Sequence, residues 1–357
     1  MTKDANALRV GILGCGPISQ FAHLESAQKA RNVVLRAVCD ADESLARRFG
    51  AFYDAERIYL NYDEMLADEG VDAVIVATSD AFHVAASLKA LKAGKHVLCE
   101  KPIGTGVEEV EHLARKVAES KRVLQVGHML RFDEGIQATH AFLRDEAGEL
   151  LAFKAWYCDS THRYTMTGAV QPMPRTGSRA IKPAGDPKAD KARYYMLAHG
   201  CHLLDLARYL CGPIQAVRAR LAQRLGAYCW FIETDFENGV LGHLDLTIPV
   251  RMDWHEGFQI YGERGSAVGK IFNPWYYKSS EVELFREKDA TYRRVLGADG
   301  HFYRRQLEGF ADVILNGAPM VGASIEDGLA SVRGMVAVAR SAQSGERVLL
   351  AEVSGEV

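Results

Sequence analysis

The stretch Val10–Ser19, which reads VGILGCGPIS, determines the fold of the first part of this chain. The apolar run Leu8–Leu13 predicts a buried strand, and the two glycines after it predict a turn whose backbone can approach a phosphate closely. Pro17 stands where a helix would begin, and the free N–H groups at a helix start favour a pyrophosphate. Ser19 replaces the third glycine of the G-x-G-x-x-G pattern, so helix–strand packing must accommodate a hydroxymethyl group there.

A second apolar strand, Val33–Cys39, favours a dinucleotide-binding turn over an ordinary strand–turn–helix because an acid follows it. Asp40 lies roughly twenty residues after the turn, where an acid that binds a ribose belongs. Its carboxylate would accept hydrogen bonds from the adenosine ribose and repel a 2′-phosphate, so we expect NAD in preference to NADP. Arg47 and Arg48 are interpreted as solvated helix residues rather than as phosphate ligands.

Composition excludes several classes of protein. The chain has 357 residues, of which 48% are hydrophobic and 25% charged, so it is long enough for two globular domains. A net charge of -3 gives no electrostatic reason to expect nucleic acid or a membrane surface as a partner. The first residues lack an export signal, so the cytoplasm is the expected compartment. Seven cysteines without a C-x-x-C pair indicate reduced core thiols rather than disulfides or a zinc site.

Two regions of different character follow one another along the chain. From Leu8 to about Met129, short apolar strands alternate with amphipathic helices, which predicts a parallel sheet covered on both faces. After about Arg131, strands follow one another with few helices, and Asn238-Gly239 is a strong hairpin signal, which together predict a mostly antiparallel sheet. We therefore expect an α/β domain over residues 1–130 and an α+β domain over residues 131–357. The last two helices are candidates for packing back on the first domain.

The segment Gly94–Pro102, GKHVLCEKP, lies at the end of the fifth predicted strand and is the second informative motif. Together with Asp40, Thr78, His83 and the run 127–132 (GHMLRF), it resembles the glucose–fructose oxidoreductase / inositol dehydrogenase / MocA family over nearly the whole chain. The resemblance implies a Rossmann domain and a second domain with an open-faced, mostly antiparallel β-sheet. It also implies that NAD(P) and a sugar or cyclitol bind between the domains, and that dimers or tetramers form through the open sheet.

Lys101 is the first candidate catalytic residue. Ligands of open α/β sheets bind at the carboxyl ends of the strands, where Lys101 falls, and the following Pro102 limits the directions in which it projects. Its side chain could exchange a proton with a substrate hydroxyl group as hydride leaves the adjacent carbon. Without the resemblance, a surface lysine after a strand would be the plainer interpretation.

The chain departs from the family in its second domain. The resemblance implies an Asp-x-x-x-His pattern on a helix, and His202 matches the histidine, an acid/base, whereas Ala198 stands in place of the aspartate. His199 could occupy part of the space of that aspartate, and Asp205 could orient the His202 ring. The alternatives are backbone contacts of both histidines at a helix start and a His-x-x-His metal site. That site lacks a third ligand nearby in sequence, so we expect no metal.

A polar insertion between Asp159 and Arg193 carries many basic residues and few acids. It is either a solvated loop or oligomer arm, or a source of arginines that pair with a carboxylate or sulfonate of an acidic sugar. Residues that could stack on a pyranose face are Tyr164, Tyr194 and Tyr195.

The candidate site residues fall into three groups. The candidate catalytic residues are Lys101, His199 and His202. The candidate cofactor-binding residues are Gly11, Gly14, Gly16, Pro17, Ile18, Asp40, Thr78, His83, Glu100 and Lys101. The candidate substrate-binding residues are Lys101, His128, Arg131, Arg163, Arg175, His199 and His202.

Three functions are compatible with these features. The first is an NAD-dependent dehydrogenase that oxidises a secondary hydroxyl group of a sugar, a sugar acid or an inositol, with Lys101 polarising the oxygen and His202 accepting the proton. The second is an NAD-dependent glycoside hydrolase that oxidises its substrate transiently, eliminates the aglycone and returns the hydride; the missing aspartate and the long insertion favour it. The third is a non-catalytic NAD-binding sensor, which Ala198 favours and the retention of Lys101 and His202 opposes.

Overall fold

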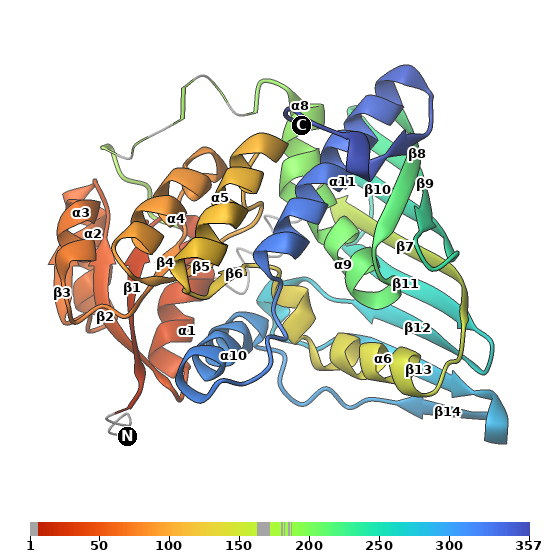
Figure 1. Ribbon diagram of the computed structural model, residues 1–357, viewed down its shortest axis with the longest axis horizontal. Helices are drawn as coiled ribbons and strands as arrows, with labels where there is room; N and C mark the ends of the chain where they lie inside the picture. Colours follow the sequence, from red (N-terminus) through yellow and green to blue (C-terminus); the bar gives the residue numbers. More distant parts are fainter. Residues whose placement is uncertain (1–5, 163–171, 180, 182, 185, 187) are drawn as a thin grey trace. The chain divides into compact units, whose positions relative to one another are not determined.

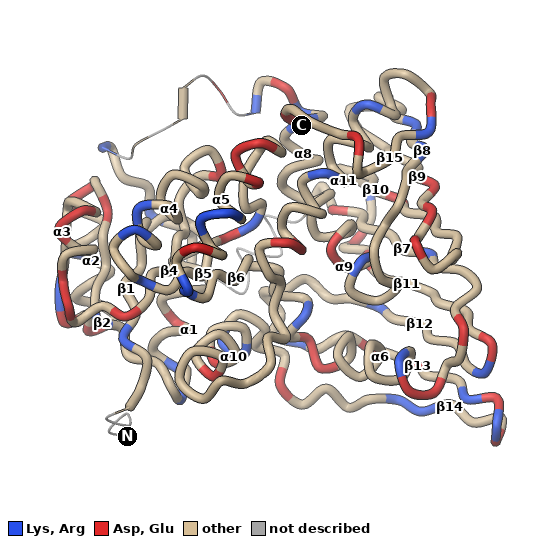
Figure 2. The backbone as a smooth tube through the Cα atoms, in the orientation of Figure 1, with Lys and Arg blue, Asp and Glu red and all other residues tan. Residues whose placement is uncertain are grey.

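The computed structural model describes residues 6–162, 172–179, 181, 183–184, 186 and 188–357 (Figure 1). The chain divides into two compact units, each made of three segments. Unit 1 comprises Met1–Met129, Pro172–Pro187 and Tyr303–Leu329, and unit 2 comprises Leu130–Gln171, Lys188–Phe302 and Ala330–Val357. Figure 2 shows basic and acidic residues mixed along the described chain.

Unit 1 contains a six-stranded sheet in the order β3-β2-β1-β4-β5-β6, in which every neighbouring pair is parallel. Its strands are β1 (Leu8–Leu13), β2 (Val33–Cys39), β3 (Arg57–Tyr59), β4 (Ala73–Val76), β5 (His96–Cys99) and β6 (Leu124–Val126). This is the strand order of a doubly wound dinucleotide-binding fold. The predicted parallel sheet of the first region is confirmed.

Helices cover this sheet. They are α1 (Leu24–Lys29), α2 (Glu43–Phe52), α3 (Tyr62–Ala67), α4 (His83–Lys92), α5 (Val107–Ser120) and α10 (Phe302–Asn316), and a π-helix (Ser19–His23) precedes α1. Leu24 of α1 and Phe310 of α10 lie in one buried cluster with Ile12 and Ile75 of the sheet. Helix α4 lies along β4 and β5 and packs against α5.

Local hydrogen bonds explain where these helices begin. The carboxylate of Asp42 accepts the backbone N–H groups of Ser44 and Leu45 at 3.0 and 3.2 Å at the start of α2. At the start of α5, the Glu109 side chain reaches back to the N–H of Gly106 at 3.0 Å. Such caps satisfy donors that have no partner within a helix, so they fix the loops at the ends of the strands.

Unit 2 contains a nine-stranded sheet in the order β14-β13-β12-β11-β7-β10-β9-β8-β15. Only β7 and β10 pair in parallel among these strands; the other neighbours are antiparallel, so the predicted mostly antiparallel sheet is confirmed. The strands are β7 (Leu150–Ser160), β8 (Ile214–Arg224), β9 (Ala227–Phe236), β10 (Leu241–Val250), β11 (His255–Gly262), β12 (Gly265–Ile271), β13 (Glu281–Arg286), β14 (Thr291–Arg294) and β15 (Val348–Leu349). The Asn238-Gly239 hairpin joins β9 to β10, with φ of +85° at Gly239.

One face of this sheet is covered by helices. Helix α6 (Glu134–Asp145) lies against β12 and β13, and α9 (Cys201–Cys211) lies against β7. The remaining helices of this part are α8 (Lys191–Tyr195), a π-helix (Met196–Gly200) and α11 (Ile325–Ser344), which begins before the division between the units. Residues alternate along the strands, and the opposite face carries exposed apolar side chains, namely Phe231, Leu241, Tyr261 and Val268. We call this second face the open face.

The described residues contain neither a helix that could span a membrane nor a cluster of side chains that could hold a metal ion. Within the part of the chain that the structure describes, no helix has both the length and the apolar character needed to cross a membrane. The same residues contain no group of three or more His, Cys, Asp or Glu side chains arranged to hold a metal ion. All seven cysteines are free thiols, and six of them are buried.

Candidate functional site

The turn after β1 has the geometry that a dinucleotide requires. Gly14 has φ of +95°, and a Cβ atom there would lie 2.7 Å from the carbonyl oxygen of Ala77, so only glycine fits. At Gly16 an added Cβ atom would meet nothing within 4 Å, which leaves that side of the turn open. Ser19 is fully buried, and its hydroxyl donates to the Gly14 carbonyl oxygen at 2.5 Å. The serine that replaces the third glycine is therefore accommodated by a hydrogen bond.

Asp40 connects the end of β2 to this turn. One carboxylate oxygen accepts the N–H of Cys15 at 2.7 Å, and the other accepts the N–H of Asp42 at 2.8 Å. A carboxylate has about four acceptor positions, so both oxygens retain capacity for ribose hydroxyl groups. The glycine turn, its open side and this acid fit the adenosine half of NAD.

Three other predicted cofactor-binding residues of unit 1, Gly11, Pro17 and Ile18, shape the strand and the turn. Gly11 lies within β1, where a Cβ atom would come within 2.9 Å of the Met65 sulfur, so it makes room for α3. Pro17 and Ile18 form the helical turn after the glycines, and Ile18 packs against the buried cluster of the sheet. His128, which was predicted as a substrate-binding residue, follows β6 and is buried.

Lys101 lies two residues beyond β5, at the carboxyl end of the strand. The peptide bond between Lys101 and Pro102 is cis. The ring of His83 is buried, with its nitrogens 2.7 Å from the Pro102 carbonyl oxygen and 3.1 Å from that of Thr78. His83 therefore joins the loop after β4 to the loop that carries Lys101, which gives this predicted cofactor residue a positioning role.

Glu100 forms a buried pair with His23, a residue that sequence analysis did not identify. The His23 Nε2 and Glu100 Oε1 atoms lie 2.9 Å apart, and the other carboxylate oxygen accepts the N–H of Lys101 at 3.1 Å. Burial would raise the pKa of Glu100, but the hydrogen bond and charge of His23, with the charge of Lys101, hold it below its ordinary value. His23 ends the π-helix, whose wider turn no sequence pattern signalled.

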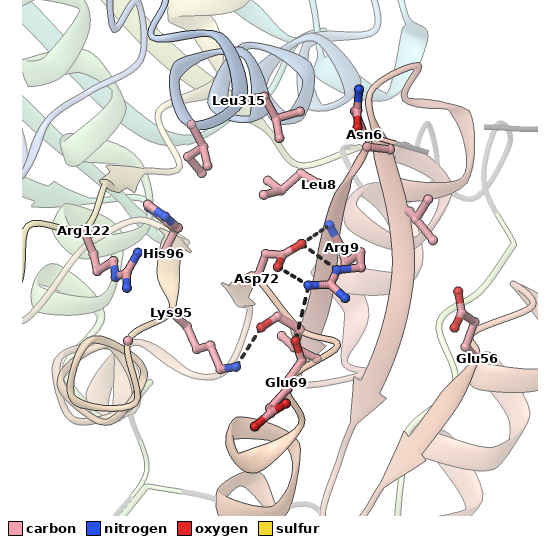
Figure 3. Close-up of a pocket in the computed structure, with 15 residues that line it drawn as sticks. Asn6, Leu8, Arg9, Glu56, Glu69, Asp72, Lys95, His96, Arg122 and Leu315 are labelled. Carbon is pink, nitrogen blue, oxygen red and sulfur yellow. Dashed lines mark hydrogen bonds and ion pairs between the residues drawn. The ribbon is translucent and has the colours of Figure 1, made fainter. Parts of the chain in front are cut away.

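Figure 3 shows a depression in unit 1 at the amino ends of the sheet strands, opposite the carboxyl ends that carry the glycine turn and Lys101. Its lining includes Arg9, Asp72 and His96, which lie at or just before the amino ends of β1, β4 and β5. The Arg9 guanidinium donates to both carboxylate oxygens of Asp72, at 2.6 and 2.8 Å (Figure 3). Because ligands of parallel sheets bind at the carboxyl ends of the strands, this depression is separate from the cofactor site.

In unit 2, the two predicted histidines meet at one aromatic ring. His199 belongs to the π-helix that precedes α9, and its Nδ1 lies 3.1 Å from the hydroxyl of Tyr157 on β7. The His202 ring, in the first turn of α9, stacks on the Tyr157 ring with centroids 6.0 Å apart. All three side chains are buried. Tyr195 also contacts His199, with ring centroids 6.1 Å apart.

Two buried acids that sequence analysis did not identify lie beside these rings. Asp159 Oδ2 lies 3.7 Å from His199 Nε2. Glu256 of β11 is paired directly with Tyr157 in the sheet register, and it accepts a hydrogen bond from the Trp254 indole at 3.2 Å. Burial raises the pKa of Glu256 to about 8; the Trp254 hydrogen bond opposes this rise, and the charges of Asp159 and Asp133 add to it by smaller amounts.

Arg131 and Asp205 form a buried ion pair within unit 2. The guanidinium donates to both carboxylate oxygens, at 3.0 and 2.7 Å, and lies over the ring of Tyr209 at 5.0 Å. Both side chains are less than a tenth exposed. The geometry gives Arg131, predicted as a substrate-binding residue, a bracing role between the segment before α6 and α9. It also gives Asp205 a cationic partner on a separate element.

Replacing Arg131 with methionine is expected to destabilise unit 2 by about 3 kcal/mol, because Asp205 then loses a charged partner in a buried place. All four tryptophans (Trp156, Trp230, Trp254 and Trp275) lie in unit 2, so urea unfolding followed by tryptophan fluorescence measures this change. The control is Arg144→Met on α6, which removes an exposed pair and should cost less than about 1 kcal/mol. Equal effects of the two substitutions would contradict the bracing role.

The structure separates the residues of the insertion. Arg175 lies in unit 1, where its backbone is bound by Gln20, whereas Tyr194 and Tyr195 lie in α8 of unit 2. Arg163 and Tyr164 fall outside the described residues. The candidate substrate residues are thus distributed over both units.

These features define a dinucleotide-binding α/β protein whose second unit carries buried histidines and acids on the helix-covered face of a β-sheet. The chain belongs to the Gfo/Idh/MocA oxidoreductase family. Residues 8–128 match the family's NAD-binding Rossmann fold, and residues 195–350 match its C-terminal alpha/beta domain. The predicted family and the predicted cofactor, NAD, are confirmed.

Relatives and solved structures extend this assignment. The chain is 30% identical over 273 residues to an inositol 2-dehydrogenase of Saccharopolyspora erythraea, which is 74% of this chain and 72% of that protein. It is 36% identical over 168 residues to an inositol 2-dehydrogenase/D-chiro-inositol 3-dehydrogenase of Shouchella clausii, and this match spans 46% of this chain and about half (49%) of that protein. A solved levoglucosan dehydrogenase in complex with NADH and levoglucosan shares the fold, with a TM-score of 0.78 and 20% identity over 96% of this chain and 99% of that one.

Proposed function

We propose that the protein is an NAD-dependent dehydrogenase that oxidises a secondary hydroxyl group of a sugar, a sugar acid or an inositol. The observation that carries the proposal is the buried cluster of His199, His202 and Tyr157 in a chain that also keeps Lys101 at the carboxyl end of β5. The names of relatives, inositol 2-dehydrogenase among them, support the substrate class.

NAD, when bound, supplies the carbon that accepts a hydride from the substrate. Lys101 would donate a hydrogen bond to the oxygen of the reacting hydroxyl group, which polarises it. His202 would accept the hydroxyl proton, because the ordinary pKa of histidine suits proton transfer near neutral pH.

In this proposal Asp159 takes the place of the aspartate that the family pattern has at position 198. Its carboxylate lies 3.7 Å from His199, whose other ring nitrogen lies 3.1 Å from the Tyr157 hydroxyl. Tyr157 in turn stacks on His202. A carboxylate at this distance favours positive charge on His199, so Asp159 would supply beside His199 the negative charge that the missing aspartate provides in the family pattern.

Aromatic side chains near the histidines support a ring-shaped, hydroxylated substrate. Tyr195 contacts both His199 and Tyr228, and Trp254 packs edge-on against Tyr157. Aromatic faces suit the C–H faces of a pyranose or cyclohexane ring, while the histidines and acids suit its hydroxyl groups.

The test is a panel of inositols, neutral sugars, glycosides and sugar acids with NAD or NADP and the purified chain. We expect NADH to accumulate with at least one of these substrates, and NADP to be used less well because Asp40 repels a 2′-phosphate. Release of an aglycone from a glycoside without net NADH would instead identify a glycoside hydrolase. NAD binding without turnover on any member of the panel would identify a sensor.

The proposal also includes self-association of the chain through the open face. The open face of the unit 2 sheet exposes Phe231 by 52% and Leu241 by 65%, which suits burial against a second copy of the chain in a homodimer or homotetramer. We place such an assembly in the cytoplasm. Light scattering in solution measures its mass.

A further inference from the structure

A short segment of the insertion packs on the NAD-binding unit rather than on the unit that surrounds it in sequence. Residues 172–179, which we call the strap, belong to unit 1 together with the rest of Pro172–Pro187 (Figure 1). The chain enters it after β7 and leaves it before α8, and both of these elements belong to unit 2. The strap is itself neither helix nor strand, so specific contacts must hold it in place.

The first contact is with the glycine turn. Gln20 donates from its side-chain amide to the carbonyl oxygen of Arg175 at 2.8 Å and accepts the Arg175 N–H at 2.8 Å. The same amide nitrogen donates to the carbonyl oxygen of Cys15, also at 2.8 Å. Gln20 follows directly after Ser19, so one side chain connects the strap backbone to the turn where a pyrophosphate binds.

The second contact is with the end of β2. The Arg179 N–H donates to Asp42 Oδ2 at 2.8 Å, and Asp42 donates its own N–H to Asp40. A Cβ atom at Gly177 would lie 2.4 Å from the same Asp42 oxygen, so the strap passes Asp42 too closely for any residue with a side chain. A hydrogen bond from the Ser44 hydroxyl, and then that from the Arg179 N–H, lower the pKa of Asp42 to about 2, because both stabilise its carboxylate.

The two contacts lie at the two places where the adenosine half of NAD is held. Gln20 adjoins the turn for the pyrophosphate, and Asp42 adjoins the acid for the adenosine ribose. The side chains of Arg175 and Arg179 are exposed and positively charged, which matches the negative charge of a pyrophosphate. The two ionisable side chains that follow directly after β2, Asp40 and Asp42, are both acidic.

We propose that the strap is part of the NAD site: it closes over the adenosine half of the bound cofactor and slows its release, with Arg175 as a ligand of the pyrophosphate. On this assignment Arg175 serves the cofactor and not a carboxylate of the sugar. The inference rests on NAD binding, which family membership supplies, and is independent of which sugar is oxidised.

The experiment measures the dissociation rate of NADH from the full-length protein, by displacement with NAD in a stopped-flow fluorimeter without any sugar. Gln20→Ala removes the contact at the turn, and Gly177→Ala disturbs the contact at Asp42 from the strap side. Each is expected to raise the dissociation rate roughly tenfold, as loss of one or two hydrogen bonds would. Arg175→Ala keeps the backbone contacts and is expected to raise the rate severalfold, with a weaker response to added salt.

The control is Gln28→Ala, which removes an exposed glutamine from α1 and should leave the dissociation rate at the wild-type value. Dissociation rates of Gln20→Ala and Gly177→Ala that both equal that of the wild type would overturn the proposal. An unchanged rate for Arg175→Ala alone would overturn the assignment of its guanidinium. Failure of the sugar-oxidation proposal would look different, because the strap variants would still release NADH faster while no sugar is turned over.

Discussion

Replacing Lys101 with methionine is expected to lower kcat by about 10²–10⁴-fold, the usual loss when a positioned acid or base is removed. Methionine keeps the length and most of the volume of the side chain but cannot donate a hydrogen bond to the substrate oxygen. The NADH dissociation constant should change little, because the glycine turn and Asp40 hold the other half of the cofactor. Steady-state kinetics with the best substrate of the panel and an NADH titration measure the two quantities.

The matched control for this substitution is Lys92→Met, an exposed lysine in the last turn of α4 in the same unit. Its kcat should equal that of the wild type. A second variant, His83→Asn, tests positioning: it weakens the link between the Thr78 and Pro102 loops and should lower kcat less than loss of the amine itself. A Lys101→Met protein that keeps its kcat, or that loses kcat and NADH binding in the same proportion, would remove Lys101 from the chemical step.

The NAD-binding half of the fold was largely predictable because its signals are local. The strands Leu8–Leu13 and Val33–Cys39 were predicted with the bounds that the structure shows. Parallel strands are buried on both faces, so they read as apolar runs, and the glycine turn fixes where the first of them ends. In unit 2 the Asn238-Gly239 hairpin was equally clear, because that turn type needs residues that tolerate positive φ.

The acids of unit 2 were not predictable because their contacts depend on distant pairing. Asp159 was assigned to the polar insertion, whereas β7 continues to Ser160. Two residues along a strand share a face, so Asp159 lies on the same side as Tyr157. Glu256 reaches Tyr157 only through the register of β11 with β7, and a lone glutamate in a strand usually faces solvent. The strap contacts are of the same kind, since Gln20 and Arg175 are 155 residues apart.

The pH dependence of stability should reveal the buried acid at position 256. Burial raises the pKa of Glu256 from the ordinary 4.5 to about 8, so between these values the folded protein holds a proton that the unfolded chain has released. Stability must then fall as pH rises across this window, by up to about 1.4 kcal/mol per pH unit, and become constant above pH 8. Glutamine at this position cannot ionise and has nearly the shape of the protonated acid.

The Glu256→Gln variant should therefore match the wild type near pH 5 and be the more stable of the two near pH 9, by roughly 4 kcal/mol if the whole shift is expressed. Urea unfolding followed by tryptophan fluorescence reports on the right unit, because Trp254 contacts Glu256 directly. Glu233→Gln, at an exposed position of β9, shows the effect of removing one negative charge at the surface. Unfolding free energies of wild type and Glu256→Gln that run parallel from pH 5 to pH 9 would mean that Glu256 is ionised in the folded protein, and the cluster beside His199 would then carry one more negative charge than we infer.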